Sequence, residues 1–369
     1  MLVGWTEEQV QLGQATKALL GRIATEREVR RLMATPNGFE PDTWSALTGL
    51  GLVSILIPEQ SDGMGGSLTD LGVVLEEMGR RLIPGPYLST AVLAVQALLA
   101  TDPAQAEPYF KQIASGAAIA TVAVTEGPGR WAEADVATSA SREHDEWRLT
   151  GVKTFVPDGA SADLILVVAR DEDGLGLYAV SGDAPGVTRS SRPTMDQTRK
   201  QAIIELNGAS AQRLRTAGPV WDVVAEIIRV GMVAVAAEQV GGALEVLDLV
   251  LDHVTNRRQF GQPIGSFQAI QHKCADMVAD IEAARSAAYY AEQAIATRAP
   301  DAAAAAELAK SYCSDMYRRV TDAAVQIFGG IGMTWEHPIH LYLKRARSSE
   351  ILFGTPAQHR ELLATMIGL

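Results

Sequence analysis

The sequence predicts an α+β protein in three parts: an N-terminal helical domain at residues 1–116, a central antiparallel β domain at 117–216 and a C-terminal helical bundle at 217–369. Two observations lead to this prediction. Near both ends of the chain, apolar residues recur every three or four positions, which is typical of amphipathic helices. Between them, short β-branched runs are separated by turn residues, which is typical of strands. With 369 residues the chain is also too long for one small core.

The first domain contains a Gly-rich loop followed by a helix. Apolar residues at three- and four-residue spacing mark the helix over Leu71–Met78, and the loop covers Pro58–Asp70. Ser67 or Thr69 is placed to cap this helix, because a hydroxyl group can accept a hydrogen bond from the free N–H groups of a first turn. The apolar stretch Ala91–Ala100 predicts a second, buried helix.

The middle domain is expected to be an antiparallel sheet. Its predicted strands share β-branched and apolar residues bounded by Gly, Pro and Asp, and they lie at 118–124, 147–156, 164–169, 175–181 and 202–206. No strand here alternates with a helix. That pattern opposes a parallel dinucleotide-binding sheet, even though glycines are plentiful.

The last domain returns to long Ala-, Leu- and Val-rich stretches from Val220 onward. Several of these stretches carry little charge, so their helices must bury more than one face, inside the bundle or against another subunit. Gly241 and Gly242 lie inside one such helix. Glycine weakens a helix unless close packing compensates, so this pair predicts a point where two helices cross.

Composition excludes several classes of function. There are 32 Lys and Arg against 44 Asp and Glu, giving a net charge of -12, which opposes binding to a nucleic-acid backbone. Cys274 and Cys313 lie outside any Cys/His cluster, so neither a disulfide framework nor a metal site is expected, and a cytoplasmic location fits. The uncharged stretch Leu82–Thr101 is interrupted by prolines and a glycine at 84–86, so no membrane insertion is expected.

Two C-terminal segments carry a family resemblance. They read RRQFGQPIGSFQAIQHKCADM at 257–277 and QIFGGIGMTWEHP at 326–338. Together with the domain order, and with PEQSDGMGGSLTDLGVVLEEMGR from Pro58, they resemble the acyl-CoA dehydrogenase family. The resemblance implies the family's fold, ending in a four-helix bundle, with FAD as cofactor and an acyl-CoA thioester as substrate. It also implies α,β-dehydrogenation, in which a glutamate removes the α-proton and the flavin accepts the β-hydride, with electron-transferring flavoprotein as the expected redox partner.

The resemblance further implies that each FAD lies between two subunits. The half that holds the adenine and pyrophosphate is intact here and would consist of Arg257, Phe260, Gln268, Gln326, Gly329 and Gly330. By the resemblance, Arg257 would pair with the pyrophosphate, since a guanidinium suits phosphate. Phe260 would pack near the dinucleotide and Gln268 would hydrogen-bond toward the adenosine. Gln326 and the two glycines would let the backbone approach the cofactor.

The half that surrounds the flavin ring departs from the family pattern. A segment that reads like TEPGAGSD in the family is TEGPGRWAEAD at Thr125–Asp135, with Arg130 and Trp131 in place of small, hydroxyl-bearing residues. The family's Trp-Ile-Thr strand reads Phe155-Val156-Pro157. Proline at the threonine position removes both an N–H group and a hydroxyl group from the flavin edge.

Both positions at which the family carries its catalytic base lack a carboxylate. The Tyr-Glu-Gly-Thr block reads Leu352-Phe353-Gly354-Thr355, which puts Phe353 at the base position, and the second position, on an earlier helix, falls at about Gly231. We therefore predict no catalytic residue and no metal ligand in this chain. Glu238 and Glu350 lie nearby in sequence and remain candidates for an alternative base.

The resulting hypothesis is a base-lacking subunit of a heteromeric, α2β2 acyl-CoA dehydrogenase, resembling actinobacterial assemblies that act on CoA thioesters of steroid side chains. Its partner would be a homologous subunit that carries the glutamate. Two alternatives remain open at this point: a homotetrameric dehydrogenase or oxidase with an unrecognised base, and a non-catalytic scaffold of the family.

Overall fold

The computed structural model describes residues 4–144 and 146–369, in the order helices, strands, helices, which confirms the α+β class. Contacts group the chain into two units. The bundle unit comprises residues up to Val29 together with 68–83 and 232–369, and the sheet unit comprises 30–67 and 84–231. The three-domain division stays a prediction.

The sheet unit is built on seven strands, and each of the five predicted runs overlaps one of them. The strands are β1 (Ala120–Ala123), β2 (Ser139–Glu143), β3 (Glu146–Pro157), β4 (Leu164–Asp171), β5 (Gly174–Ser181), β6 (Val187–Arg192) and β7 (Gln201–Leu214). Because β5 pairs with both β4 and β7, the strand order returns on itself and the sheet closes like a barrel.

Two strand pairings are parallel, which the sequence pattern did not predict. β1 pairs in parallel with β4, from Ala120 opposite Leu164 to Ala123 opposite Val167, and β2 meets β4 at one parallel position. The hairpin of β2 and β3 lies between β1 and β4 in sequence, and such a long crossover permits parallel pairing. The other pairings are antiparallel.

Helices of the sheet unit are α3 (Pro41–Gly49), α5 (Val95–Leu99), α6 (Pro103–Ala114) and the first part of α7 (Val220–Asn256). The helix predicted at Ala91–Ala100 begins earlier, with buried π-helical turns over Leu88–Ala94 that lead into α5. The hydroxyl group of Thr90 donates to the carbonyl oxygen of Ala120 at 2.9 Å and ties these turns to β1.

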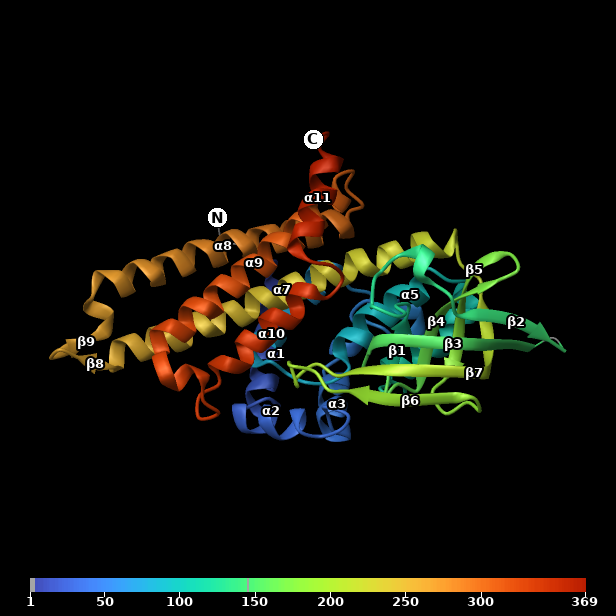
Figure 1. Ribbon diagram of the computed structural model, residues 1–369, viewed down its shortest axis with the longest axis horizontal. Coiled ribbons are helices and arrows are strands. Elements are labelled where there is room, and N and C mark those ends of the chain that lie inside the picture. Colours follow the sequence, from blue (N-terminus) through green and yellow to red (C-terminus); the bar gives the residue numbers. More distant parts are fainter. Residues whose placement is uncertain (1–3, 145) are drawn as a thin grey trace. The chain divides into compact units, whose positions relative to one another are not determined.

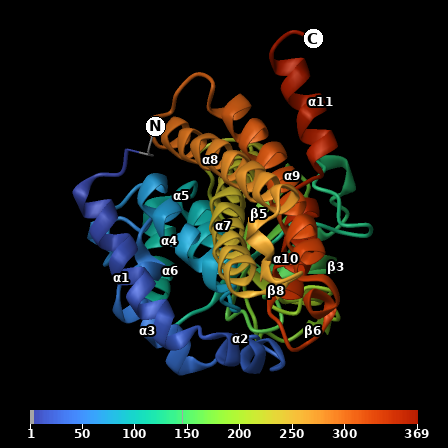
Figure 2. The same cartoon turned by 90° about the vertical axis from the view of Figure 1, so that its left-hand side faces the viewer.

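The bundle unit consists of α1 (Glu7–Ile23), α4 (Leu68–Arg81), the rest of α7, α8 (Gln268–Ala296), α9 (Ala302–Phe328), α10 (Ile339–Ile351) and α11 (Pro356–Met366), while α2 (Glu26–Met33) spans the boundary. Figures 1 and 2 show α7, α8 and α9 lying side by side. A hairpin of β8 (Arg258–Gln259) and β9 (Gln262–Pro263) joins α7 to α8 at one end of the bundle (Figure 1).

The predicted helix crossing lies where α7 meets α4. A Cβ atom on Gly241 would lie 1.8 Å from the carbonyl oxygen of Glu76, and one on Gly79 would lie 2.0 Å from that of Glu238. Each helix therefore has a glycine against the backbone of the other. Every residue of α7 from Val230 to Ala243 is buried, so this low-charge stretch of the helix buries all its faces, as expected.

Candidate cofactor half-site and base position

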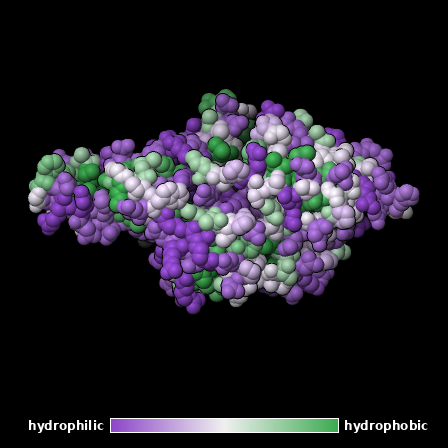
Figure 3. All heavy atoms as spheres, turned by 60° about the horizontal axis from the view of Figure 1, so that its bottom comes forward, coloured by the Kyte–Doolittle hydropathy of each residue, from purple (hydrophilic) through white to green (hydrophobic). Residues whose placement is uncertain are grey.

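The β8–β9 turn presents an aromatic ring at the end of the bundle. Arg257 extends the last turn of α7, its N–H group donating to the carbonyl oxygen of His253 at 2.8 Å. Phe260 then adopts a φ of 52°, and its side chain is 92% exposed, edge-on to Phe267 at 6.1 Å between ring centroids. A left-handed backbone is costly for a bulky residue, so the turn holds Phe260 outward at the expense of strain. Apolar surface interrupts the hydrophilic surface at this end (Figure 3).

A second segment of the predicted half-site lies where α9 ends. Gly329 has a φ of 66° and starts a 3₁₀ turn over Gly329–Met333. A Cβ atom on either Gly329 or Gly330 would meet nothing within 4 Å, so the backbone here is open to close approach. The exposed Gln326, one turn earlier, lines an open groove between α9 and α10 together with Arg319 and Leu343.

A stack of three rings brings these two segments to the same end of the bundle. The centroid of the His253 ring, on α7, lies 4.4 Å from that of the Phe328 ring at the end of α9, and the centroid of the His337 ring lies 4.1 Å from that of Phe328. Burial lowers the pKa of His253, and the neighbouring charge of Arg257 lowers it further. Phe328 could not be recognised from the sequence, because an apolar residue at a helix end carries no mark of what it contacts.

The residues of the half-site are chemically suited to an adenine dinucleotide. All six predicted residues are exposed: Arg257, Phe260, Gln268, Gln326, Gly329 and Gly330. Gln268 is the first residue of α8, and no side chain caps that helix, so its first N–H groups are available to a phosphate. A guanidinium, an uncapped helix start and open glycine backbone form a donor set that fits a diphosphate. Their assignment as cofactor ligands stays a prediction.

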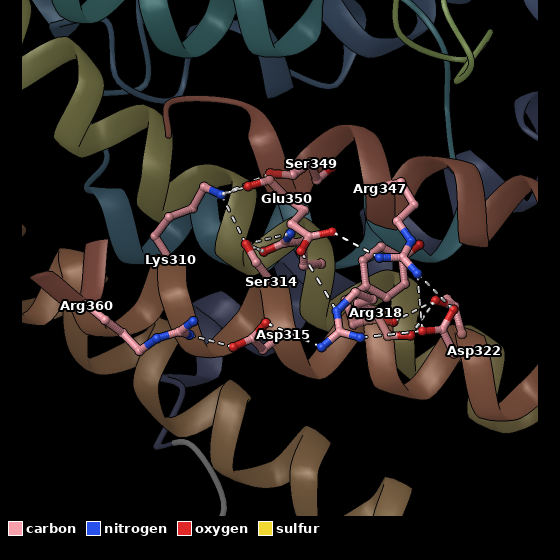
Figure 4. Close-up of polar contacts among 12 residues, drawn as sticks. Lys310, Ser314, Asp315, Arg318, Asp322, Arg347, Ser349, Glu350 and Arg360 are labelled. Carbon is pink, nitrogen blue, oxygen red and sulfur yellow. Dashed lines mark hydrogen bonds and ion pairs between the residues drawn. The ribbon is translucent and has the colours of Figure 1, made fainter. Parts of the chain in front are cut away.

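At the base position, a buried lysine holds the loop between α10 and α11. Phe353 is 4% exposed and has a φ of 66°. The ammonium group of Lys310, on α9, donates to the carbonyl oxygens of Ser349 and Glu350 at 3.0 Å each and to that of Gly354 at 3.3 Å. Figure 4 shows Lys310 pointing at the end of α10. These include carbonyls that the last turn of a helix leaves unpaired, so Lys310 caps α10 and fixes the loop.

A histidine and glutamate pair supports the same loop from α11. The Nδ1 atom of His359 lies 2.6 Å from a carboxylate oxygen of Glu307, and both side chains are buried. Its Nε2 atom would lie 2.9 Å from a Cβ atom on Gly354, whose φ is 118°. In the described residues Nε2 has no hydrogen-bond partner. Glu307 and Lys310 stand three residues apart on one face of α9, a spacing that could have indicated a shared role.

The two carboxylates considered as alternative bases are both held by arginines. Glu238 is buried and forms an ion pair with Arg345, which is also buried. The carboxylate of Glu350 lies 3.4 Å from Arg347 and 3.8 Å from Arg318 (Figure 4). Both carboxylates therefore already face guanidinium groups.

In the sheet unit, a buried ion pair fixes the start of the Thr125–Asp135 segment. The ammonium group of Lys153 donates to Glu126 at 2.6 Å, and the N–H groups of Ala137 and Thr138 donate to the same carboxylate at 2.9 and 3.0 Å. Burial lowers the pKa of Lys153 to about 8, with Glu126 opposing the shift. Burial alone would raise the pKa of Glu126, but Lys153 and Thr138 outweigh it, so the pKa is lowered.

The rest of this segment packs on itself. Arg130 forms a two-point ion pair with Asp135 at 2.8 and 3.0 Å. The ring of Phe155 lies against Gly129, where a Cβ atom would be only 2.6 Å from it, and Phe155 has a φ of 54°. Two of the residues that depart from the family pattern, Arg130 and Phe155, therefore contact residues of this segment. They do not present the small, hydroxyl-bearing surface that the resemblance leads one to expect beside a flavin ring.

Sequence models of three domains match this chain in order. The acyl-CoA dehydrogenase N-terminal domain matches residues 6–117, the middle domain 112–207 and the C-terminal domain 221–368. The chain belongs to the acyl-CoA dehydrogenase family. It is 34% identical over 354 residues to acyl-CoA dehydrogenase IpdE2 of Mycolicibacterium smegmatis, with 96% of each chain covered.

Two solved structures are similar over nearly the whole chain. The Tcur3481–Tcur3483 steroid ACAD is 30% identical with a TM-score of 0.88, covering 98% of both chains. The ChsE4–ChsE5 complex from Mycobacterium tuberculosis is 27% identical with a TM-score of 0.89, covering 100% of this chain and 99% of that one. These findings confirm the predicted family and fold.

Family membership establishes the general chemistry. Acyl-CoA dehydrogenases are FAD-dependent oxidoreductases that act on CH–CH bonds of acyl-CoA substrates, so the predicted cofactor is confirmed at the level of the family. Over the described residues, no helix combines the length and apolar character of a membrane span. The same residues contain no group of three or more His, Cys, Asp or Glu side chains arranged to hold a metal ion.

Proposed function

We propose that this chain is one subunit of a heteromeric FAD-dependent acyl-CoA dehydrogenase, in which it binds the adenine and pyrophosphate end of FAD. A homologous partner would carry the catalytic glutamate and surround the flavin ring. One observation carries this proposal: the six residues predicted to form a dinucleotide half-site are all exposed, while the predicted base position of the same chain is filled by the buried Phe353.

The exposed residues of the half-site support binding of the adenine and pyrophosphate end of FAD at the surface of this chain. Arg257 would pair with the diphosphate, the uncapped start of α8 would receive a phosphate oxygen, and the Gly329–Gly330 backbone would lie close to the dinucleotide. When bound, FAD supplies the hydride acceptor. A strained and fully exposed Phe260 is explained if the ring packs against a partner and its cofactor, since backbone strain persists at functional sites.

The base position supports the assignment of proton abstraction to the partner. A phenyl ring cannot accept a proton, and the loop that carries Phe353 is fixed by Lys310 and by His359. Glu238 and Glu350 are engaged by arginines, which argues against the alternative of a homotetramer with an unrecognised base. The crowded Thr125–Asp135 segment supports a flavin ring bound by the partner rather than by this chain.

The proposed substrate is a CoA thioester of a steroid-derived acid. This rests on the similarity to the Tcur3481–Tcur3483 steroid ACAD, a relative that is aligned over nearly its whole length. Comparing turnover of a steroid-ring thioester with that of a straight-chain thioester tests the assignment. Electron-transferring flavoprotein is the proposed acceptor.

The decisive experiment is purification with and without a homologous subunit that has an intact Tyr-Glu-Gly-Thr block. We expect the chain alone to be colourless, and the complex to hold one FAD per pair of chains and to reduce a dye with acyl-CoA. A yellow, dye-reducing chain on its own would overturn the proposal in favour of a homomeric enzyme. A colourless complex would instead indicate a scaffold.

Substitution of Arg257 tests the half-site directly. Arg257→Ala removes a charge-assisted contact of about 1.5–3 kcal/mol, so FAD should be bound by the complex about tenfold to a hundredfold more weakly. Equilibrium dialysis of FAD measures this. Arg360→Ala is the matched control, because it removes an exposed arginine whose ion pair with Asp315 is worth little. Equal FAD affinity in the two variants would contradict the assignment of Arg257.

A further inference from the structure

Glu292 is a buried acid that the proposed function does not use. It lies on α8, where that helix packs against α4, and its side chain is 5% exposed. A Cβ atom on Gly72 would lie 2.3 Å from both oxygens of its carboxyl group. The carboxyl group thus lies flat on the backbone of α4, at a position that only glycine allows.

The charges around Glu292 do not balance if every group is ionised. Arg285 donates to both carboxylate oxygens of Glu76, at 2.9 Å each, so its charge is already committed. Among the described residues, two further titratable groups face Glu292: the buried thiol of Cys313 on α9 and the phenol of Tyr289 on α8, while α7 contributes the apolar Ala237 and Val240. Burial raises the pKa of Glu292 well above its ordinary value, and the charge of Glu76 adds to the shift.

The same group of side chains holds the N-terminal segment. The Arg285 guanidinium lies 4.7 Å from the centroid of the Trp5 ring, a cation–π contact. The hydroxyl group of Tyr289 donates to the carbonyl oxygen of Gly4 at 3.1 Å. Trp5, Glu76, Arg285, Tyr289 and Glu292 line one small cavity, so a charge at Glu292 would lie beside the contacts that hold Trp5.

We propose that Glu76, Arg285 and Glu292 form a pH-sensitive latch that keeps the Gly4–Trp5 segment closed over α8 while Glu292 is protonated. Loss of the Glu292 proton to solvent places a second carboxylate beside Glu76. The two carboxylates then compete for Arg285, which draws the guanidinium away from Trp5. The segment opens as a result.

Acrylamide quenching of Trp5 fluorescence tests the latch in the full chain. The Trp5 signal is the difference between the wild type and Trp5→Phe, since the chain has 6 tryptophans. We expect Trp5 to be shielded at neutral pH and quenched at alkaline pH, and to stay shielded at both in Glu292→Gln. Glu307→Gln, at another buried glutamate, should leave the transition in place. A wild type without the transition, or the same transition in Glu292→Gln, would overturn the latch.

An infrared measurement keeps the proposal testable if Glu292→Gln does not fold. The wild type should show the carbonyl stretch of a protonated carboxylic acid at neutral pH, and should lose it over the pH range in which Trp5 becomes exposed. Absence of that band at neutral pH would overturn the latch.

An acid whose pKa is raised in the folded chain destabilises the fold as pH rises, because the unfolded chain ionises first. The contribution of Glu292 to stability should therefore fall as pH rises from the ordinary carboxyl range.

Discussion

Phe353 adopts a left-handed φ of 66°, a conformation that costs a non-glycine residue about 1–2 kcal/mol. Such strain persists only where the surroundings determine the backbone. Lys310 supplies that constraint, since its ammonium group binds carbonyl oxygens on both sides of Phe353. His359 adds a second constraint beside Gly354. Lys310 and His359 thus fix the loop as structural residues, and neither is proposed to take part in the reaction.

Truncation of Phe353 should lower the stability of the chain without changing turnover in the complex. Phe353→Ala should lower the free energy of unfolding by about 3–5 kcal/mol, because it leaves a cavity, yet turnover per bound FAD in the complex should be unchanged. Urea unfolding and dye reduction measure the two quantities. Phe328→Ala is the matched control: it removes an equally buried ring, but it also breaks the stack with His253, so FAD affinity should fall as well. Loss of turnover per FAD in Phe353→Ala would show that the loop takes part in the reaction.

At the scale of elements, the crossing of α4 and α7 depends on glycines that face opposite backbones. Intrinsic helix propensity favours alanine over glycine by about 0.5–1 kcal/mol, and the sequence tolerates that loss at Gly241 and Gly79. Glycine is needed at both positions because a Cβ atom there would collide with the carbonyl oxygen of Glu76 or Glu238 and keep the two helices apart.

Two Gly-to-Ala substitutions should therefore change the free energy of unfolding in opposite directions. Gly241→Ala forces α4 and α7 apart and should destabilise the chain by about 1–3 kcal/mol, as overpacking does. Gly21→Ala, on the exposed face of α1, where a Cβ atom meets nothing within 4 Å, should stabilise it by about 0.5–1 kcal/mol. Thermal unfolding measures both. A stabilised Gly241→Ala variant would contradict the close packing of the two helices.

At the scale of the whole molecule, features that depend on residues close in sequence could be predicted better than contacts between residues far apart in sequence. Helical spacing located α4 and the bundle helices, and the Gly241–Gly242 pair located a crossing, because these features depend on neighbouring residues. The parallel pairing of β1 with β4 was missed, since it depends on which strands meet after the intervening hairpin. The residues of the half-site could be proposed because their motifs are contiguous, and their role stays a prediction. Lys310 could not, because its partners are backbone carbonyls, which leave no mark in a sequence.

Trp335 is the residue that we expect to anchor the interface with a homologous subunit. Trp335 follows the Gly329–Met333 turn and is 57% exposed, with the Lys344 ammonium 4.5 Å from its ring centroid and His340 edge-on at 4.6 Å. An exposed tryptophan held in one orientation is typical of an interface anchor. Trp335→Ala should weaken association with the partner by about tenfold to a hundredfold, measured by surface plasmon resonance, and leave FAD content per assembled complex unchanged. Leu362→Ala, which truncates an exposed residue of α11, is the control. Equal affinity in both variants would exclude Trp335 as an anchor without affecting the assignment of the half-site.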